Sequence, residues 1–365
     1  MLILENKTQK RIQSPAYNLF FDKQTGFTAR WGVTKEDDPP YSPAPEILDL
    51  EISEVISADQ KVESPYHIYT DDICNRNCPF CYKRNNRGGI TKHLNLDGVK
   101  LILDKMRQPN GGYLLTQVAL GITSSDSHPQ LFEIAAEFKN RQICCNLTCN
   151  GVGFTDDLAQ KYVKHFNAIA VSVNSRNKEE AYNTIQKLTT LGCKQTNVHF
   201  VIAEESFEEA KQLIGEVATD TRLKNLNAVV LLAFKDKQKT GVYMPIKSVD
   251  RYRDLLRFAE SRRVKIGLDS CSGPVYLSTI RGDKDEKKLA EVVETCCACR
   301  FSSYISCNMD YFPCSFLEGV EEWETGLNLT KVSNFSEIWD SARVEDYRKY
   351  VIGCGEKRCP CHYFD

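Results

Sequence analysis

Residues 67–82 read HIYTDDICNRNCPFCY and place three cysteines within eight residues, directly after a short β-branched run. Cys74, Cys78 and Cys81 have the spacing CxxxCxxC. Thiolates this close together on a loop can converge on one metal centre without a helix or strand to hold them. A closed zinc site or a ferredoxin-type cluster needs four protein ligands, whereas three thiolates on a four-iron cluster leave one iron open. The spacing therefore predicts an open metal centre, and a structural zinc loop with a fourth ligand elsewhere is the alternative.

On the carboxyl-terminal side of this stretch, apolar runs alternate with segments of helical periodicity. The expected strands are 67–70, 117–121, 143–148, 168–173, 197–202, 228–234 and 264–268. The expected helices are 96–107, 129–139, 156–165, 178–191, 206–217 and 249–262. Strand–helix units in succession form a parallel sheet with helical crossovers. The expected fold class is therefore α/β, either a barrel or a doubly wound sheet, with its ligand site at the carboxyl ends of the strands.

The cysteine motif resembles the signature of the radical S-adenosylmethionine (radical SAM) superfamily, in which an aromatic residue, here Phe80, precedes the third cysteine. The resemblance implies a partial (β/α)6 barrel of the TIM type, with a [4Fe–4S] cluster on Cys74, Cys78 and Cys81. It also implies that the open iron chelates SAM, and that reduction by a flavodoxin or ferredoxin yields a 5′-deoxyadenosyl radical. That radical would remove a hydrogen atom from the substrate, with Phe80 flanking the adenine.

The resemblance also implies SAM contacts at the ends of successive strands. Gly121 keeps the glycine of the family's GGE-like segment, although the acidic residue is absent or displaced to Asp126. LTCNG resembles the family's TNG element, and VSVNS places polar residues where related enzymes bind SAM. The candidates for cofactor binding are Phe80, Gly121, Thr148, Asn150, Ser172, Asn174 and Asn197, with Arg176 as a carboxylate partner. His128 is either a site residue or an ordinary histidine near a helix start.

Eight of the sixteen cysteines fall between residues 296 and 361, too densely for core packing, so this region is predicted to bind metal. Cys296, Cys299 and Cys314 have the spacing CxxC-x14-C, and a helix-like segment separates them from Cys354, Cys359 and Cys361. The region resembles the SPASM and twitch extensions of radical SAM enzymes, and Met309 stands in its NMDYFPC hairpin where glycine is common. The resemblance implies one auxiliary [4Fe–4S] cluster on these cysteines, with Cys297 competing with Cys296 for the first position. Cys144, Cys145, Cys149 and Cys193 are expected to be packing residues or free thiols, whereas the second cluster could recruit Cys271 at the expected boundary.

The composition of the chain limits the classes of partner that it can bind. The net charge is −2 from 47 basic and 49 acidic side chains, which excludes the basic surface typical of a nucleic-acid-binding protein. No signal peptide and no apolar run long enough to cross a membrane is present, so a cytoplasmic location is expected. The expected division is a proline-rich extension at 1–60, irregular or built of small elements, a radical SAM core at 61–270 and a cysteine-rich domain at 271–365.

These features favour a peptide- or protein-modifying enzyme of the kind that matures ribosomally made peptides. A peptide leader would bind residues 1–60 or a separate recognition protein. Two alternatives remain at this stage: a radical SAM dehydrogenase or cyclase that acts on a small molecule, and a non-catalytic zinc-binding protein. The sequence identifies no catalytic acid, base or hydrogen donor.

Overall fold

A parallel sheet with helical crossovers is the centre of the computed structural model, which describes residues 1–34, 37–74, 78–83, 89–237 and 239–354. Within these residues the main sheet has the order β14-β13-β12-β11-β10-β9-β5-β15-β16-β17. Its strands are β5 (Ile47–Glu51), β9 (Gln117–Gly121), β10 (Cys144–Cys149), β11 (Ala168–Ser172), β12 (Thr196–Ile202), β13 (Ala228–Ala233), β14 (Ile266–Leu268), β15 (Ser302–Ile305), β16 (Asp310–Phe312) and β17 (Leu327–Asn328). All neighbours from β14 to β15 pair in parallel, and β15, β16 and β17 pair antiparallel. The sheet is open, with β14 and β17 at its two edges.

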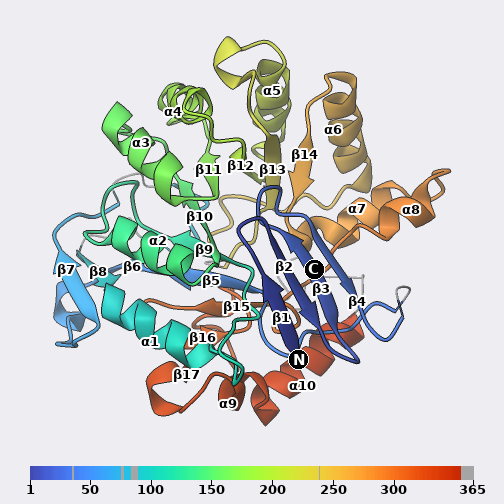
Figure 1. Cartoon of the computed structure of the whole chain (residues 1–365). Coiled ribbons are helices and arrows are strands. Elements are labelled where there is room, and N and C mark those ends of the chain that lie inside the picture. Colours follow the sequence, from blue (N-terminus) through green and yellow to red (C-terminus); the bar gives the residue numbers. More distant parts are fainter. Residues whose placement is uncertain (35–36, 75–77, 84–88, 238, 355–365) are drawn as a thin grey trace.

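Helices cover one face of this sheet, and Figure 1 shows α2 to α6 along the outer side of the curved row from β9 to β14. The helices are α1 (Leu96–Met106), α2 (Leu131–Asn140), α3 (Asp156–His165), α4 (Lys178–Thr190), α5 (Phe207–Val217), α6 (Val249–Ser261), α7 (Gly273–Thr279), α8 (Glu286–Ala290), α9 (Ser336–Trp339) and α10 (Ala342–Cys354). Short 3-10 turns occupy Ala58–Gln60, Thr221–Leu223, Ser270–Ser272 and Leu329–Lys331. The predicted α/β class and its crossovers are confirmed.

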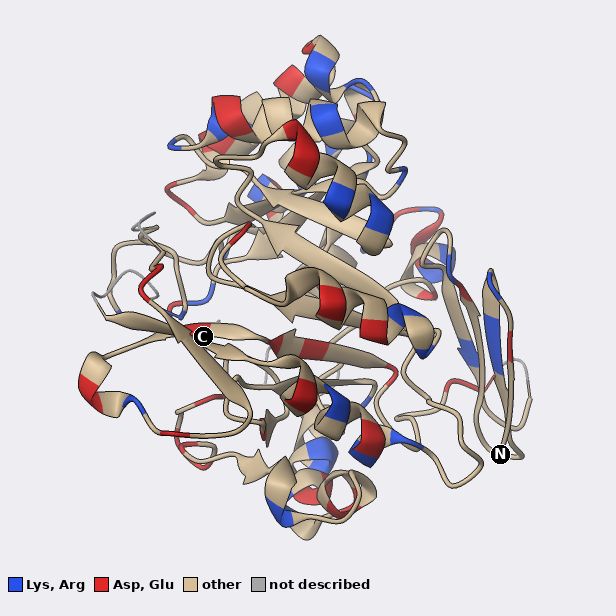
Figure 2. Cartoon of the chain, turned by 60° about the vertical axis from the view of Figure 1, so that its left-hand side comes forward, with Lys and Arg blue, Asp and Glu red and all other residues tan. Residues whose placement is uncertain are grey.

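The helices form where capping and apolar spacing agree. Thr155 accepts a hydrogen bond from the Leu158 N–H at the start of α3, and Ser248 accepts one from the Arg251 N–H at the start of α6. In α1, buried residues recur every three or four positions, which turns one stripe of the helix toward the sheet. Figure 2 shows Lys and Arg interspersed with Asp and Glu along the outer helices. Among the described residues, none of the helices is both long enough and apolar enough to span a bilayer.

One predicted strand forms but does not take its expected place. Residues 67–70 are β7 (His67–Thr70), which pairs antiparallel with β8 (Ile90–Leu94) in a separate sheet of order β6-β8-β7, where β6 is Ser53–Ile56. The position next to β9 belongs to β5, whose Leu48 and Leu50 are buried. The prediction that 67–70 begins the parallel sheet is therefore wrong, because β5 supplies the alternating apolar side chains that the helix-covered face requires.

The expectation for residues 1–60 allows irregular structure or small elements, and the structure shows small regular elements. Four strands, β1 (Leu2–Glu5), β2 (Gln9–Gln13), β3 (Asn18–Asp22) and β4 (Thr28–Trp31), form an antiparallel sheet in sequence order. Its buried side chains pack with Leu114 and Cys144, which lie at the amino ends of β9 and β10. The Lys10 ammonium is fully buried and donates to the Leu115 carbonyl at 2.7 Å. The small sheet thus covers the amino ends of the strands, opposite the end where ligands bind.

Each of the three expected segments contributes one or more strands to the main sheet. β5, from the first segment, lies between β9 of the second and β15 of the third. The Arg30 guanidinium binds the Glu46 carboxylate at 2.7 Å and also pairs with Glu294. The division into 1–60, 61–270 and 271–365 stays a prediction.

Candidate functional site

The face of the parallel strands that points away from the helices carries polar side chains. Asn146 donates to the Gln117 side chain at 2.8 Å, and the Thr148 hydroxyl lies 3.2 Å from His199 Nδ1. Burial lowers the pKa of His199 to about 4, so its imidazole is neutral at pH 7. Asn197 lies near the amino end of β12 and accepts a hydrogen bond from Asn227, and it is thus remote from the strand end where the resemblance predicts SAM.

Two cavities flank the first cysteine loop. One, of about 130 Å³, is lined by Cys78, Phe80, Asn174, Arg176 and Tyr243, among others. The other, of about 270 Å³, is lined by residues that include Cys74, Ser124, Asp126 and Asn150. The structure thus brings three predicted SAM contacts, Phe80, Asn174 and Asn150, next to the predicted cluster ligands. Gly121, Thr148 and Ser172 lie on the strands but line neither cavity.

Tyr243 is a member of the first cavity that the sequence did not single out. Its ring contacts Phe80 edge-on, with centroids 6.1 Å apart, and Phe234 at 5.7 Å. It belongs to a long loop after β13, where no motif marks it. Residues 78–81 form a tight turn, in which the Cys81 N–H donates to the Cys78 carbonyl at 3.1 Å.

The backbone conformation explains why the segment LTCNG ends in a glycine. Gly151 has a φ of +71°, and a Cβ at this position would lie 2.9 Å from Ala181 Cα. Its carbonyl accepts a hydrogen bond from Thr184 in α4. The side-chain oxygen of Asn150 accepts from the Val152 N–H at 3.0 Å, which fixes the turn that carries it to the second cavity.

His128 has a structural role, which is the second of its two interpretations. Its Nε2 bonds the Leu94 carbonyl at 2.9 Å, and its Nδ1 accepts from the Gln130 N–H at 3.0 Å. Its ring lies edge-on to His93, with centroids 4.9 Å apart. Burial lowers the pKa of His128 to about 4. Burial, together with the neighbouring His128, lowers the pKa of His93 to about 3.

These lowered pKa values predict a loss of stability in acid. Below pH 6.5 these two histidines become protonated in the unfolded chain but stay neutral in the folded protein. Between pH 7 and pH 5, each histidine therefore lowers the free energy of unfolding by on the order of 2 kcal/mol. We expect His128→Gln, which keeps one donor and one acceptor, to lower the melting temperature at pH 7.5 but to reduce its fall between pH 7.5 and pH 5. Thermal unfolding of both proteins at the two pH values measures this, and equal falls would contradict the assignment.

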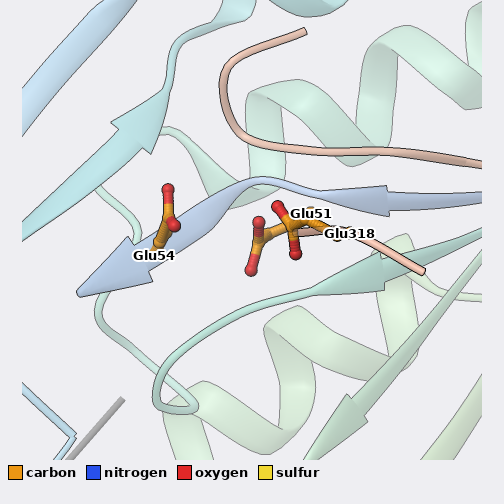
Figure 3. Close-up of side chains that lie close together, drawn as sticks. All are labelled: Glu51, Glu54 and Glu318. Atoms are coloured by element: carbon orange, nitrogen blue, oxygen red, sulfur yellow. The ribbon is translucent and has the colours of Figure 1, made fainter. Parts of the chain in front are cut away.

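A buried charged network lies between the two cysteine regions, and Figure 3 shows its three glutamates. The Lys83 ammonium binds the Glu51 carboxylate at 2.9 Å and also contacts Glu318. The Tyr304 hydroxyl donates to Glu51 at 3.0 Å. Lys83 follows Cys81 by two residues and Glu318 follows Cys314 by four, so the network joins the two cysteine segments.

The network is electrostatically balanced by lysines. Ligand oxygens of Glu51, Glu54 and Glu318 lie within 4.8 Å of one another, but Lys92 binds Glu54 at 2.9 Å and Lys83 binds the other two. The ammonium groups therefore already supply the positive charge that a metal ion would bring. Burial raises the pKa of Glu51 to about 7, with Lys83 opposing the shift and the neighbouring carboxylates adding to it. Sequence reasoning missed this site because it did not expect β5.

The second cysteine region gathers around Cys299, which is fully buried and has a φ of +48°. Burial raises the pKa of the Cys299 thiol, and the sulfurs of Cys296 and Cys314 are close enough to add to the rise. Cys297 instead directs its sulfur to the Glu294 carboxylate at 2.9 Å. This arrangement favours Cys296 over Cys297 as a partner of Cys299 and Cys314.

The other cysteines of this region differ in their placement. Cys354 ends α10, whereas Cys359 and Cys361 lie outside the described residues. Cys307, for which no role was predicted, is fully buried, and its sulfur lies 3.5 Å from the Lys92 carbonyl. Met309 has a φ of +61°, the conformation that makes glycine common at this hairpin position. The background cysteines Cys144, Cys145, Cys149 and Cys193 are buried, as predicted.

Comparison with known protein families shows to which superfamily the chain belongs. The model of the Radical SAM superfamily matches residues 68–259, more than half of the chain. The chain belongs to the radical SAM superfamily. Membership implies a [4Fe–4S] cluster and SAM, and the three half-buried thiols beside two cavities fit that requirement. The alternative of a non-catalytic zinc-binding protein is therefore wrong, because the protein is a radical SAM enzyme.

Solved structures share the fold of this radical SAM enzyme. Streptococcus suis SuiB bound to precursor peptide SuiA has a TM-score of 0.66 at 11% identity, over 94% of this chain and 90% of SuiB. SuiB bound to S-adenosylmethionine gives 0.60 at 15% identity, over 88% of this chain and 77% of SuiB. Native anSMEcpe with bound AdoMet and the Cp18Cys peptide gives 0.56 at 15% identity, over 84% and 83%. No curated protein matches the sequence.

Proposed function

We propose that this radical SAM enzyme modifies a peptide or protein side chain and that it carries one auxiliary [4Fe–4S] cluster. The observation that carries the proposal is the presence of two cysteine sites joined by one buried charged network. The fold supports a peptide substrate, because two of the similar structures contain a bound peptide. In the cell, a flavodoxin or ferredoxin would supply electrons, and a separate protein could present the peptide.

Cys74, Cys78 and Cys81 would hold the first cluster through their thiolates. When bound, the cluster and SAM supply the 5′-deoxyadenosyl radical that removes a hydrogen atom from the substrate. In the smaller cavity, Phe80 and Tyr243 form an apolar wall suited to a planar base. Arg176 and Glu209 line the same cavity and give it one charge of each sign, which suits a zwitterionic ligand.

The remaining predicted SAM contacts are ranked by their position. Asn150 lines the larger cavity beside Cys74, so it has the strongest support after Phe80 and Asn174. Gly121, Thr148 and Ser172 lie toward the carboxyl ends of their strands. Asn197, near the amino end of β12, has the weakest support.

We assign the auxiliary cluster to Cys296, Cys299 and Cys314, with a fourth ligand from Cys354, Cys359 or Cys361. The electrostatic coupling of Cys299 to Cys296 and Cys314 supports this set. The ligands would exclude water from the cluster on one side, since Cys299 is fully buried.

The Glu51 carboxylate is the proposed proton acceptor. A substrate radical that forms a new bond would give one electron to the auxiliary cluster and also lose a proton, which needs a base nearby. Because burial raises its pKa to about 7, the Glu51 carboxylate can hold a proton near neutral pH. Glu318 is about one-fifth exposed and contacts the same Lys83 ammonium, which offers the proton a route toward water.

The test uses a peptide encoded by a short reading frame beside this gene. Anaerobically reconstituted enzyme is incubated with SAM, dithionite and the peptide, and 5′-deoxyadenosine and peptide mass are measured. We expect peptide-dependent formation of 5′-deoxyadenosine, a peptide product that has lost hydrogen, and deuterium transfer into 5′-deoxyadenosine from a deuterated peptide. A scrambled peptide is the control. Turnover of a small alcohol with no response to any peptide would support the dehydrogenase or cyclase alternative instead.

A further inference from the structure

Arg348 of α10 is buried next to the second cysteine region, with 4% of its surface exposed. Its Nε donates to the Cys299 carbonyl at 2.7 Å, and its Nη2 donates to the Trp339 carbonyl at 2.8 Å. The guanidinium also lies over the rings of Trp339 and Tyr41, at 4.6 and 4.8 Å from their centroids. These contacts fix a positive charge beside Cys299.

No carboxylate of the described residues lies within 4 Å of this guanidinium. Asp340 is the acid that Arg348 influences from farther away: burial raises the pKa of Asp340, and the guanidinium opposes that rise. A buried cation without a contacting anion is costly, because its desolvation is not offset by a close counter-charge. The position of Arg348 therefore calls for an anion near Cys299.

Tyr311 of β16 is a second buried polar group that lacks a partner. The residue is fully buried, three positions before Cys314, and its hydroxyl has no hydrogen-bond partner among the described residues. Trp323 and Phe335 hold the ring edge-on, with centroids 6.2 and 5.7 Å away. Leaving such a donor unpaired costs about 1–3 kcal/mol.

The two side chains share one neighbourhood. Burial raises the pKa of Tyr311, and Cys299, Arg348 and Cys314 are close enough to influence that pKa. Arg348 and Cys314 in turn influence the pKa of Cys299. In the part of the chain that the structure describes, a hydroxyl without a partner and a cation without a contacting carboxylate thus lie near the same pair of cysteines.

We propose that Arg348 and Tyr311 set the reduction potential of the auxiliary cluster, Arg348 as its counter-cation and Tyr311 as a hydrogen-bond donor to one of its sulfurs. The inference rests on the proposed function, because it requires the auxiliary cluster. A thiolate-bound cluster is anionic and its sulfurs accept hydrogen bonds, and net charge and such bonds set cluster potentials. Both groups stabilise the more negative reduced state, so both raise the potential. Neither residue is a ligand.

The test measures the auxiliary cluster alone, in the full chain with Cys74, Cys78 and Cys81 replaced by alanine. Redox titration followed by electron paramagnetic resonance gives its midpoint potential with and without each further substitution. We expect Tyr311→Phe and Arg348→Met each to shift the reduced-to-oxidised ratio at a fixed potential about tenfold toward the oxidised form, which is about 59 mV for one electron. Arg348→Lys, which keeps the charge but not the two-carbonyl geometry, should recover part of the shift.

Stability of the metal-free chain separates this role from a purely structural one. Without the cluster the Tyr311 hydroxyl has no partner to lose, so Tyr311→Phe should leave the melting temperature unchanged or raise it. Tyr162→Phe is the control, because its hydroxyl donates to the Ser125 carbonyl at 2.5 Å, and it should lower the melting temperature without changing the potential.

Three outcomes would overturn the proposal. An unchanged potential in Tyr311→Phe and Arg348→Met at full iron and sulfide content would remove the tuning role but keep the auxiliary cluster. A lower melting temperature of metal-free Tyr311→Phe would show a structural hydroxyl. The absence of a second cluster from the unsubstituted protein would remove both this inference and the auxiliary part of the proposed function. If Arg348→Met fails to fold, the potential and the melting temperature of Tyr311→Phe test the proposal by themselves.

Discussion

Replacing Cys74, Cys78 and Cys81 together with alanine should reduce SAM cleavage to the level of an enzyme-free control. The three thiols lie in one short loop, half-buried, and two of them line the cavities where SAM is proposed to bind. Without them the open iron and the chelation of SAM are lost together. The measurement is 5′-deoxyadenosine formed from SAM under dithionite in anaerobic protein.

Cys193→Ala is the matched control for this prediction. Cys193 is buried next to α4 and belongs to the hydrophobic core, so its loss removes a thiol without touching the loop. This variant should keep SAM cleavage. Cleavage that persists in the triple variant, or that is lost in both variants, would contradict the assignment of the first site.

Lys83→Met should be strongly destabilising, because it leaves the Glu51 and Glu318 carboxylates buried without the ammonium that binds both. Breaking a buried ion pair from one side costs about 3–5 kcal/mol, which corresponds to about 4–7 °C in melting temperature for a chain of 365 residues. Thermal unfolding of the metal-free chain measures the effect.

The triple substitution Lys83→Met, Glu51→Gln and Glu318→Gln is the decisive comparison. It removes the unpaired charges as well as the ammonium, so it should recover much of the stability that Lys83→Met loses. Lys349→Met is the surface control, because Lys349 and Asp346 form an exposed pair whose loss costs little. If the triple variant is no more stable than Lys83→Met, buried charge is not the cause of the destabilisation.

Local patterns made most of the parallel sheet predictable. The expected helix at 156–165 coincides with α3, and the expected strand at 117–121 with β9. Such elements carry their own apolar spacing and capping residues, so neighbouring residues suffice to define them. β5 was not predicted, because the eight residues before it contain four prolines, and such a segment indicates loop structure.

The candidate site was predictable only where a motif is contiguous. The first cysteine motif and its aromatic Phe80 are read directly from eight successive positions. Lys83 and Glu318, by contrast, are 235 residues apart, and Glu51 joins them from a third segment. Tyr311 and Arg348 are linked in the same way through Cys299. Contacts of this kind arise from the pairing of β5 with β15 and the packing of α10, which no local pattern encodes.

The central claim is that one chain holds two separate iron–sulfur sites, and counting iron, acid-labile sulfide and zinc per chain tests it most directly. The unsubstituted protein, purified and reconstituted without oxygen, should contain about eight irons and about eight sulfides. The variant that lacks Cys74, Cys78 and Cys81 and the variant Cys299→Ala with Cys314→Ala should each keep about half, and only the second should cleave SAM. Iron for a single cluster in the unsubstituted protein, or zinc in place of iron at the second site, would contradict the account.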